Sequence, residues 1–173
     1  MKFYEPAEDS LILLKWVEKL SKGRVLDMGT GSGIQAMGAS KKADEVIAVD
    51  INPDAVKASK EWIKEKDIKN VKVMLSDLFS NVEGKFDVII FNAPYLPEDE
   101  EVKDTDTMGR ETTLKFLREA NNYLNKNGFI LLVVSSHTNM DDVARAGKKF
   151  KIEILEKATL FFEELYVLKL TND

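Results

Sequence analysis

The tetrapeptide Asn92-Ala93-Pro94-Tyr95 directly follows the apolar run 86–91. Asn92 offers a side-chain carbonyl and Ala93 a backbone carbonyl, and Pro94 keeps Ala93 out of the helical region, which turns that carbonyl toward a pocket. Tyr95 adds a flat ring that can stack on a planar group. Two acceptors that take both N–H protons of such a group would orient its nitrogen lone pair for attack on an electrophile. The pattern predicts a site for a planar nitrogen, although Asn and Pro are also common where a strand simply turns into a loop.

A glycine-rich turn lies between the apolar run 24–28 and a short helical pattern that ends near Ser40. Strand, glycine turn and helix in this order bring backbone N–H groups and a helix N-terminus to a ligand. The spacing Gly-x-Gly-x-Gly is shorter than that of a dinucleotide site. Asp27 would repel a pyrophosphate there, but it could pair with the ammonium of a methionine moiety. The turn residues predicted to bind this ligand are Gly29, Thr30, Gly31 and Gly33.

Two further acids follow the next two predicted strands. Asp50 ends the second strand, where a carboxylate can accept hydrogen bonds from both hydroxyls of a ribose. Asp77 follows the third strand and can accept from an adenine amino group, with Ile51 and Leu78 packing on the purine faces. Ligands bind at the carboxyl ends of strands in such sheets, so the three acids around one turn predict S-adenosylmethionine as the cofactor. The alternative is a tight turn with ordinary acids at strand ends.

The composition limits the classes of function. A formal net charge of −5 disfavours non-specific binding to nucleic acid, and the absence of Cys excludes disulfides and thiolate metal sites. The single His leaves no histidine cluster for a metal. No apolar run approaches the length of a membrane span, and no signal-peptide pattern opens the sequence. We therefore expect a cytoplasmic protein without a membrane segment.

Apolar runs alternate with helical patterns along the chain, which predicts an α/β fold with a Rossmann-like, mostly parallel sheet and helices on both faces. Residues 1–173 are predicted to form one domain, with a loop over 96–110 and a helix over 112–125. The last two strands are expected to form an antiparallel C-terminal hairpin. The seven predicted strands cover residues 24–28, 46–50, 71–75, 86–91, 129–135, 151–158 and 162–170.

At these residues the chain resembles class I S-adenosylmethionine-dependent methyltransferases that carry an Asn-Pro-Pro-Tyr motif. It is most similar to the release-factor glutamine methyltransferases in their archaeal and eukaryotic form. The segment Tyr4–Ser10 is similar to the N-terminal signature of that group, and residues 49–53 and 76–78 match its cofactor segments. One difference is that Ala93 replaces the first Pro of the motif, which keeps the carbonyl but removes stiffness.

The resemblance implies a function and a partner. It implies that Ser10 and Asn92 also contact the cofactor, and that residues 92–95 hold a glutamine of the Gly-Gly-Gln loop of a translation release factor. It further implies a small zinc-ribbon activator protein on an apolar sheet edge, here residues 71–75. The bacterial form's extra N-terminal substrate domain is absent from this sequence.

Other acceptors fit the same tetrapeptide. An exocyclic amino group of adenine or guanine is planar too, although the acidic charge makes nucleic acid a less favoured substrate. A protein lysine is a further candidate, because the group resembled here includes members of dual specificity. A non-catalytic protein that only binds the cofactor would be a different class, and the intact acids and tetrapeptide argue against it.

Overall fold

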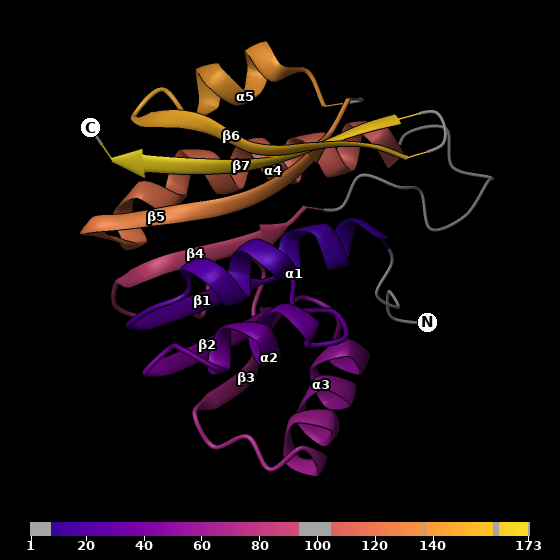
Figure 1. Cartoon of the computed structure of the whole chain (residues 1–173), viewed down its shortest axis with the longest axis vertical. Coiled ribbons are helices and arrows are strands. Elements are labelled where there is room, and N and C mark those ends of the chain that lie inside the picture. Colours follow the sequence, from indigo (N-terminus) through magenta and orange to yellow (C-terminus); the bar gives the residue numbers. More distant parts are fainter. Residues whose placement is uncertain (1–7, 94–104, 137, 161–162, 173) are drawn as a thin grey trace.

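A seven-stranded sheet forms the centre of the molecule in the computed structural model, which describes residues 8–93, 105–136, 138–160 and 163–172 (Figure 1). Its strand order is β3-β2-β1-β4-β5-β7-β6. The first five strands in this order pair in parallel, and β7 is antiparallel to both of its neighbours. This confirms the predicted sheet and hairpin. The strands are β1 Arg24–Met28, β2 Glu45–Asp50, β3 Val71–Leu75, β4 Phe86–Asn92, β5 Leu124–Ser135, β6 Phe150–Leu160 and β7 Glu163–Asn172.

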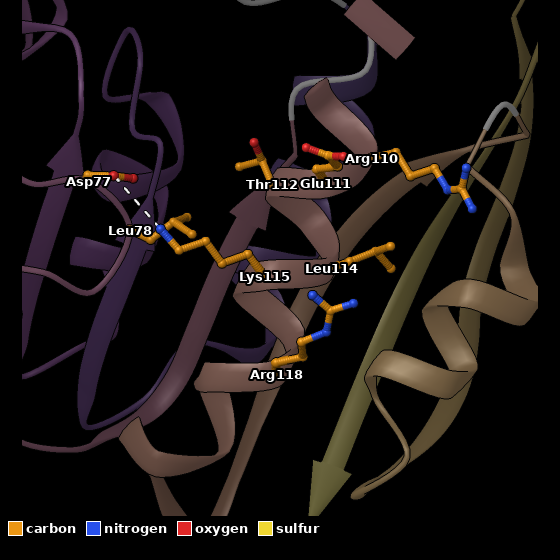
Figure 2. A pocket seen from close by; sticks show the side chains of 8 residues that line it. All are labelled: Asp77, Leu78, Arg110, Glu111, Thr112, Leu114, Lys115 and Arg118. Carbon is orange, nitrogen blue, oxygen red and sulfur yellow. Dashed lines mark ion pairs between the residues drawn. The ribbon is translucent and has the colours of Figure 1, made fainter. Parts of the chain in front are cut away.

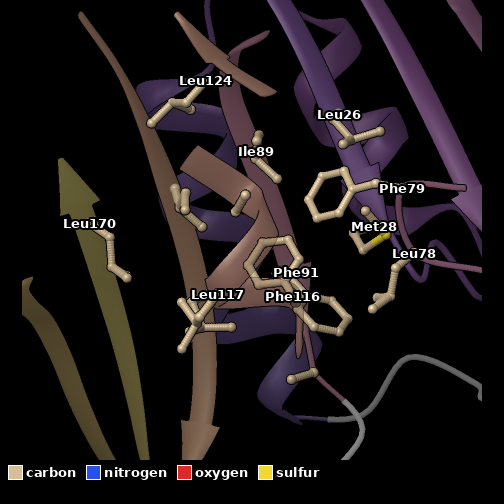
Figure 3. Close-up of a cluster of buried hydrophobic side chains, with 14 of the residues drawn as sticks. Leu26, Met28, Leu78, Phe79, Ile89, Phe91, Phe116, Leu117, Leu124 and Leu170 are labelled. Atoms are coloured by element: carbon tan, nitrogen blue, oxygen red, sulfur yellow. The ribbon is translucent and has the colours of Figure 1, made fainter. Parts of the chain in front are cut away.

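Helices cover both faces of the sheet. Buried side chains of α1 and α2 pack with one face, and those of α4 and α5 pack with the other. Figure 3 shows the second cluster, in which Phe116 of α4 lies against Phe91 of β4 with ring centroids 4.6 Å apart. The helices are α1 Glu8–Leu20, α2 Ile34–Ser40, α3 Pro53–Glu65, α4 Thr105–Ala120 and α5 Met140–Ala146, and a 3-10 turn covers Asn121–Tyr123.

Local sequence explains most of these elements. The central strands are continuous apolar runs because both faces of a parallel sheet are buried, and Val25, Val88 and Ile89 have no exposed surface. Helix α3 begins where the Asn52 side chain accepts a hydrogen bond from the Asp54 N–H, with proline in its first turn. The carboxyl ends of β1, β2, β3 and β4 consequently lie side by side at one edge.

The structure corrects the predicted elements around α4. The segment 105–110, predicted as loop, belongs to this helix, and the helix ends at Ala120 rather than at Asn125. Residues 124–128, predicted as helix end and turn, belong to β5 instead. The Asn125 Nδ2 donates to the Asp87 Oδ1 at 2.8 Å, a contact with the neighbouring strand that favours the extended backbone over another helical turn.

None of the helices within the described residue ranges is long and apolar enough to cross a membrane.

Candidate functional site

The glycine turn joins β1 to α2 and has one defined shape. Gly29, Gly31 and Gly33 have φ angles of 64°, 51° and 83°, a region that favours glycine because it lacks a Cβ. The Thr30 N–H donates to the Val49 carbonyl at 2.9 Å, and the Gly33 N–H donates to the Thr30 carbonyl at 2.8 Å. The turn is therefore held against the end of β2.

Asp27 lies beneath this turn and is 1% exposed. Its Oδ2 accepts hydrogen bonds from the Thr30 Oγ1 at 2.6 Å and from the Ala36 N–H at 3.0 Å. Burial raises the pKa of Asp27 to about 7; hydrogen bonds from Thr30 and Ala36 oppose the rise, and the nearby charge of Asp50 adds to it. A buried carboxyl with such a pKa is suited to gaining its charge when a cation arrives.

Asp50 connects the end of β2 to the same turn. Its Oδ2 accepts from the Gly31 N–H and its Oδ1 from the Asn52 N–H, both at 2.9 Å. Each carboxylate oxygen has a second lone pair, so further donors can still bind. Ile51, next in sequence, is 66% exposed, which is unusual for a large apolar side chain.

Asp77 and Leu78 follow the end of β3. The buried Leu78 has a φ of 46°, a left-handed conformation that a side chain of this kind rarely adopts and that is concentrated at functional sites. The Ser76 Oγ donates to the Leu78 carbonyl at 2.7 Å, and the Asp77 N–H donates to the Ser80 Oγ at 3.1 Å. These contacts hold the strained backbone in place.

A groove of about 690 Å³ lies between this loop and α4 (Figure 2). The Lys115 Nζ lies 3.9 Å from the Asp77 Oδ2, an exposed pair of little strength. The groove therefore opens beside Asp77, the acid predicted to accept a hydrogen bond from the adenine amino group. Its lining residues are Asp77, Leu78, Arg110, Glu111, Thr112, Leu114, Lys115 and Arg118.

Asn92 ends β4 and faces the first turn of α1. Its Nδ2 donates to the Asp9 Oδ2 at 2.7 Å and lies 3.2 Å from the Ser10 Oγ. Its Oδ1 is shielded from solvent and has no hydrogen-bond partner among the described residues. A buried acceptor without a donor costs free energy, so a hydrogen bond from a ligand to this oxygen would be favourable.

The structure brings most of the residues predicted from sequence to one edge of the sheet, at the carboxyl ends of β1 to β4. Ser10 contacts Asn92, and Asp50 contacts Gly31. Ala93 is 3% exposed, whereas Pro94 and Tyr95 lie outside the described residues.

Sequence reasoning missed two residues of this region. Asp9, considered above only as part of the segment Tyr4–Ser10, is 1% exposed and contacts Asn92. Gln35 is 3% exposed, and its Nε2 donates to the Ser10 carbonyl at 2.8 Å, which ties α2 to α1. The signal available for Gln35 was an amide within the otherwise apolar helical pattern 34–39.

Comparison with known proteins identifies a protein family that this chain matches. Residues 7–161 match the model of the methyltransferase small domain. A protein of Methanocaldococcus jannaschii with the provisional name protein N5-glutamine methyltransferase is 42% identical over 95% of this chain and 89% of its own length. The ribosomal protein L11 methyltransferase of Lactobacillus gasseri is 31% identical over 85% of this chain, which spans only 42% of that protein.

Solved structures share the fold. A chain in the E. cuniculi Mtq2–Trm112 complex, which is responsible for methylation of the translation termination factor eRF1, superposes with a TM-score of 0.78. The match covers 100% of both chains at 23% sequence identity.

Proposed function

This chain belongs to the methyltransferase small domain family, and we propose that it transfers a methyl group from S-adenosylmethionine to the side-chain amide nitrogen of a glutamine in a translation release factor. The observation that carries the choice of acceptor is the buried Oδ1 of Asn92 at the end of β4, which has no hydrogen-bond partner among the described residues. An amide NH₂ has two N–H donors, and one of them would satisfy this oxygen.

The cofactor fits the residues at the ends of β1, β2 and β3. The positive φ angles of the turn let its backbone approach a ligand closely, since a Cβ at these glycines would be strained. We assign the ribose hydroxyls to Asp50, whose carboxylate oxygens can accept further hydrogen bonds. We assign the adenine to the exposed Ile51, the buried Leu78 and Asp77. Asp27 is assigned to the ammonium of the methionine moiety, where its ionisation would be favoured.

When bound, S-adenosylmethionine supplies an electrophilic methyl group on a sulfonium centre. Asn92 and the carbonyl of Ala93 would accept the two N–H protons of the acceptor and so direct its lone pair. This arrangement favours positive charge on the amide nitrogen as it gains the methyl group, which is its second carbon substituent. The proton lost afterward is acidic, so the chain does not require a general base at this site.

The release factor is proposed from relatives as well as from the site. The M. jannaschii relative matches this chain over nearly its full length and is provisionally named for glutamine methylation. The E. cuniculi complex acts on a termination factor. A glutamine on a projecting loop could reach an acceptor site at a strand end, whereas a free amino acid would lack the surrounding contacts.

We further propose that a small zinc-ribbon activator protein binds along β3. This strand is at one end of the sheet and, within the described residues, pairs with β2 only. Leu75 is 49% exposed, while Val71 and Val73 are partly buried against the helical layer. An exposed edge with an apolar side chain can accept a strand from a partner. The E. cuniculi Mtq2 protein likewise forms a complex, with Trm112, which supports a protein partner for this chain.

The function is tested by parallel incubation of the purified chain with radiolabelled cofactor and three acceptors, with and without a coexpressed zinc-ribbon protein. The acceptors are a release factor, a histone-like protein and RNA. We expect label on the release factor, located by peptide mapping at the glutamine of its Gly-Gly-Gln loop. Label on RNA or lysine and none on the release factor would overturn the proposal.

A further inference from the structure

We infer that Asp9 is a positioning residue that sets the orientation of the Asn92 amide and thereby makes the site select glutamine over glutamate. The inference rests on the proposed function, because it concerns how that acceptor is chosen. It adds a residue that makes no contact with the methyl group and acts through Asn92.

The contact joins two rigid elements. Asp9 lies in the first turn of α1, and its Oδ2 is 2.7 Å from the Asn92 Nδ2 at the end of β4. Helix α1 is anchored on the sheet by Leu13 and Val17, both without exposed surface. The Gln35 side chain holds the backbone of Ser10 from α2. Neither partner can therefore move away without disturbing buried packing.

The chemistry of a carboxylate fixes which end of the amide faces it. An ionised Asp9 can only accept hydrogen bonds, so the NH₂ end of Asn92 must point toward it and the carbonyl end must point away. The reversed amide would bring two acceptors, the Asn92 Oδ1 and the Asp9 carboxylate, into contact. The Asn92 Oδ1 accordingly faces away from Asp9 and finds no hydrogen-bond donor within the part of the chain that the structure describes.

The fixed orientation has a consequence for selectivity. A carbonyl that points away from Asp9 can accept a hydrogen bond from an N–H donor and repels a carboxylate oxygen. It therefore favours the amide of a glutamine over the carboxylate of a glutamate. A reversed Asn92 would instead present its NH₂, which can donate a hydrogen bond to the glutamate oxygen. Asp9 thus acts on both the rate and the choice of acceptor.

The first test is Asp9→Ala. We expect kcat/KM for a release-factor Gly-Gly-Gln loop to fall roughly ten- to a hundredfold, since misplacing a reacting group by a small distance has effects of this size. The cofactor dissociation constant should change less than the rate. A loop with Glu in place of Gln should become a better competitive inhibitor relative to the Gln loop. An unchanged kcat/KM together with unchanged Gln-over-Glu preference would overturn the inference.

A side-chain exchange separates positioning from simple loss of stability. Asn92→Asp alone places two carboxylates in contact and should be nearly inactive. Asp9→Asn combined with Asn92→Asp restores one donor and one acceptor across the contact and again leaves an oxygen outward. We expect the double variant to be at least about tenfold more active than Asn92→Asp alone. A double variant no better than the single one would contradict the assigned orientation.

A third measurement does not require the acceptor to be known. In ¹⁵N-edited NMR spectra the side-chain NH₂ signals of Asn92, identified by their loss in Asn92→Ala, should shift in Asp9→Ala. They should stay in place in Leu11→Ala, a control on the exposed side of α1, where Leu11 is 56% exposed. Unshifted signals in Asp9→Ala would refute the contact. Failure of the wild-type chain to methylate glutamine would instead refute the proposed function. The NMR shift would still report on the contact between Asp9 and Asn92.

Discussion

The cofactor end and the acceptor end of the site are built in different ways. At the cofactor end, Asp27 and Asp50 already accept hydrogen bonds from the turn and from neighbouring backbone N–H groups. At the acceptor end, Asn92 is held through its nitrogen and its oxygen has no partner among the described residues. The first end is organised before its ligand arrives, and the second leaves one strong acceptor open for its substrate.

The origin of the contacts differs as well. The cofactor end relies on contacts between residues near each other in sequence, such as Thr30 with Asp27. The acceptor end relies on the contact of Asn92 with Asp9, which are 83 residues apart. The proposed cofactor end is therefore built from the β1–α2 turn and the adjoining end of β2, whereas the proposed acceptor end depends on how α1 docks onto the sheet.

The largest effect is expected from Asp27, because its burial disfavours the charged form of the carboxyl. Because the folded pKa is about 7 and the ordinary value is 3.8, the folded protein keeps a proton that the unfolded chain loses between these values. The contribution of Asp27 to the free energy of unfolding is therefore greatest below about pH 4, falls as the pH rises, and levels off above about pH 7, a loss of at most about 4 kcal/mol.

Urea unfolding of the wild type and of Asp27→Asn across this pH range checks the prediction. The stability of the variant relative to the wild type should increase from low to neutral pH, because its amide does not ionise. Parallel pH profiles for the two proteins would show that the pKa of Asp27 is not raised in the folded state, and would contradict this prediction.

A smaller effect is expected from Asp50→Ala, which removes the acceptor shared by Gly31 and Asn52. Hydrogen bonds to a charged acceptor contribute roughly 1.5–3 kcal/mol, so affinity for S-adenosylmethionine should fall about ten- to a hundredfold. Calorimetry measures this, with Asp44→Ala, an exposed carboxylate before the opposite end of β2, as control. Equal affinities of the two variants would exclude Asp50 as the ribose acceptor.

The smallest effect is expected from Ala93→Pro. Proline keeps the backbone carbonyl and fixes φ, so transfer should stay within about twofold of the wild type. The measurement is kcat/KM with the same release-factor loop. A loss beyond about tenfold would indicate that the Ala93 N–H is itself hydrogen-bonded, and that the acceptor end is less tolerant than proposed.

Sequence patterns predicted the sheet closely because its strands are apolar runs buried on both faces. The bounds of β1 and β3 match those predicted, and the acids at the ends of β1, β2 and β3 lie where parallel strands require. The predicted start of α4 was wrong, because its first turn, Thr105–Met108, and Gly109 contain residues of low helix propensity, a pattern that is typical of a loop. Further along the helix, Phe116 and Leu117 are buried against the sheet, a contact that helix propensity does not include.

The role of Asp9 could not be predicted from sequence for a different reason. The strand order places β4 beside β1, and α1 then brings Asp9 to the end of β4. No spacing in the sequence encodes that distance. The lack of a donor to the Asn92 Oδ1 among the described residues likewise becomes apparent only in the folded structure.

Single-turnover methyl transfer to the Gly-Gly-Gln loop, measured for the wild type and Asn92→Ala with Gln and Glu loops, tests the open acceptor most directly. We predict transfer to the Gln loop alone, and a fall of about 10²–10³ in rate for Asn92→Ala at unchanged unfolding temperature, the usual cost of losing one preorganised polar partner. A wild-type rate in Asn92→Ala, or equal methylation of the Gln and Glu loops, would contradict the account.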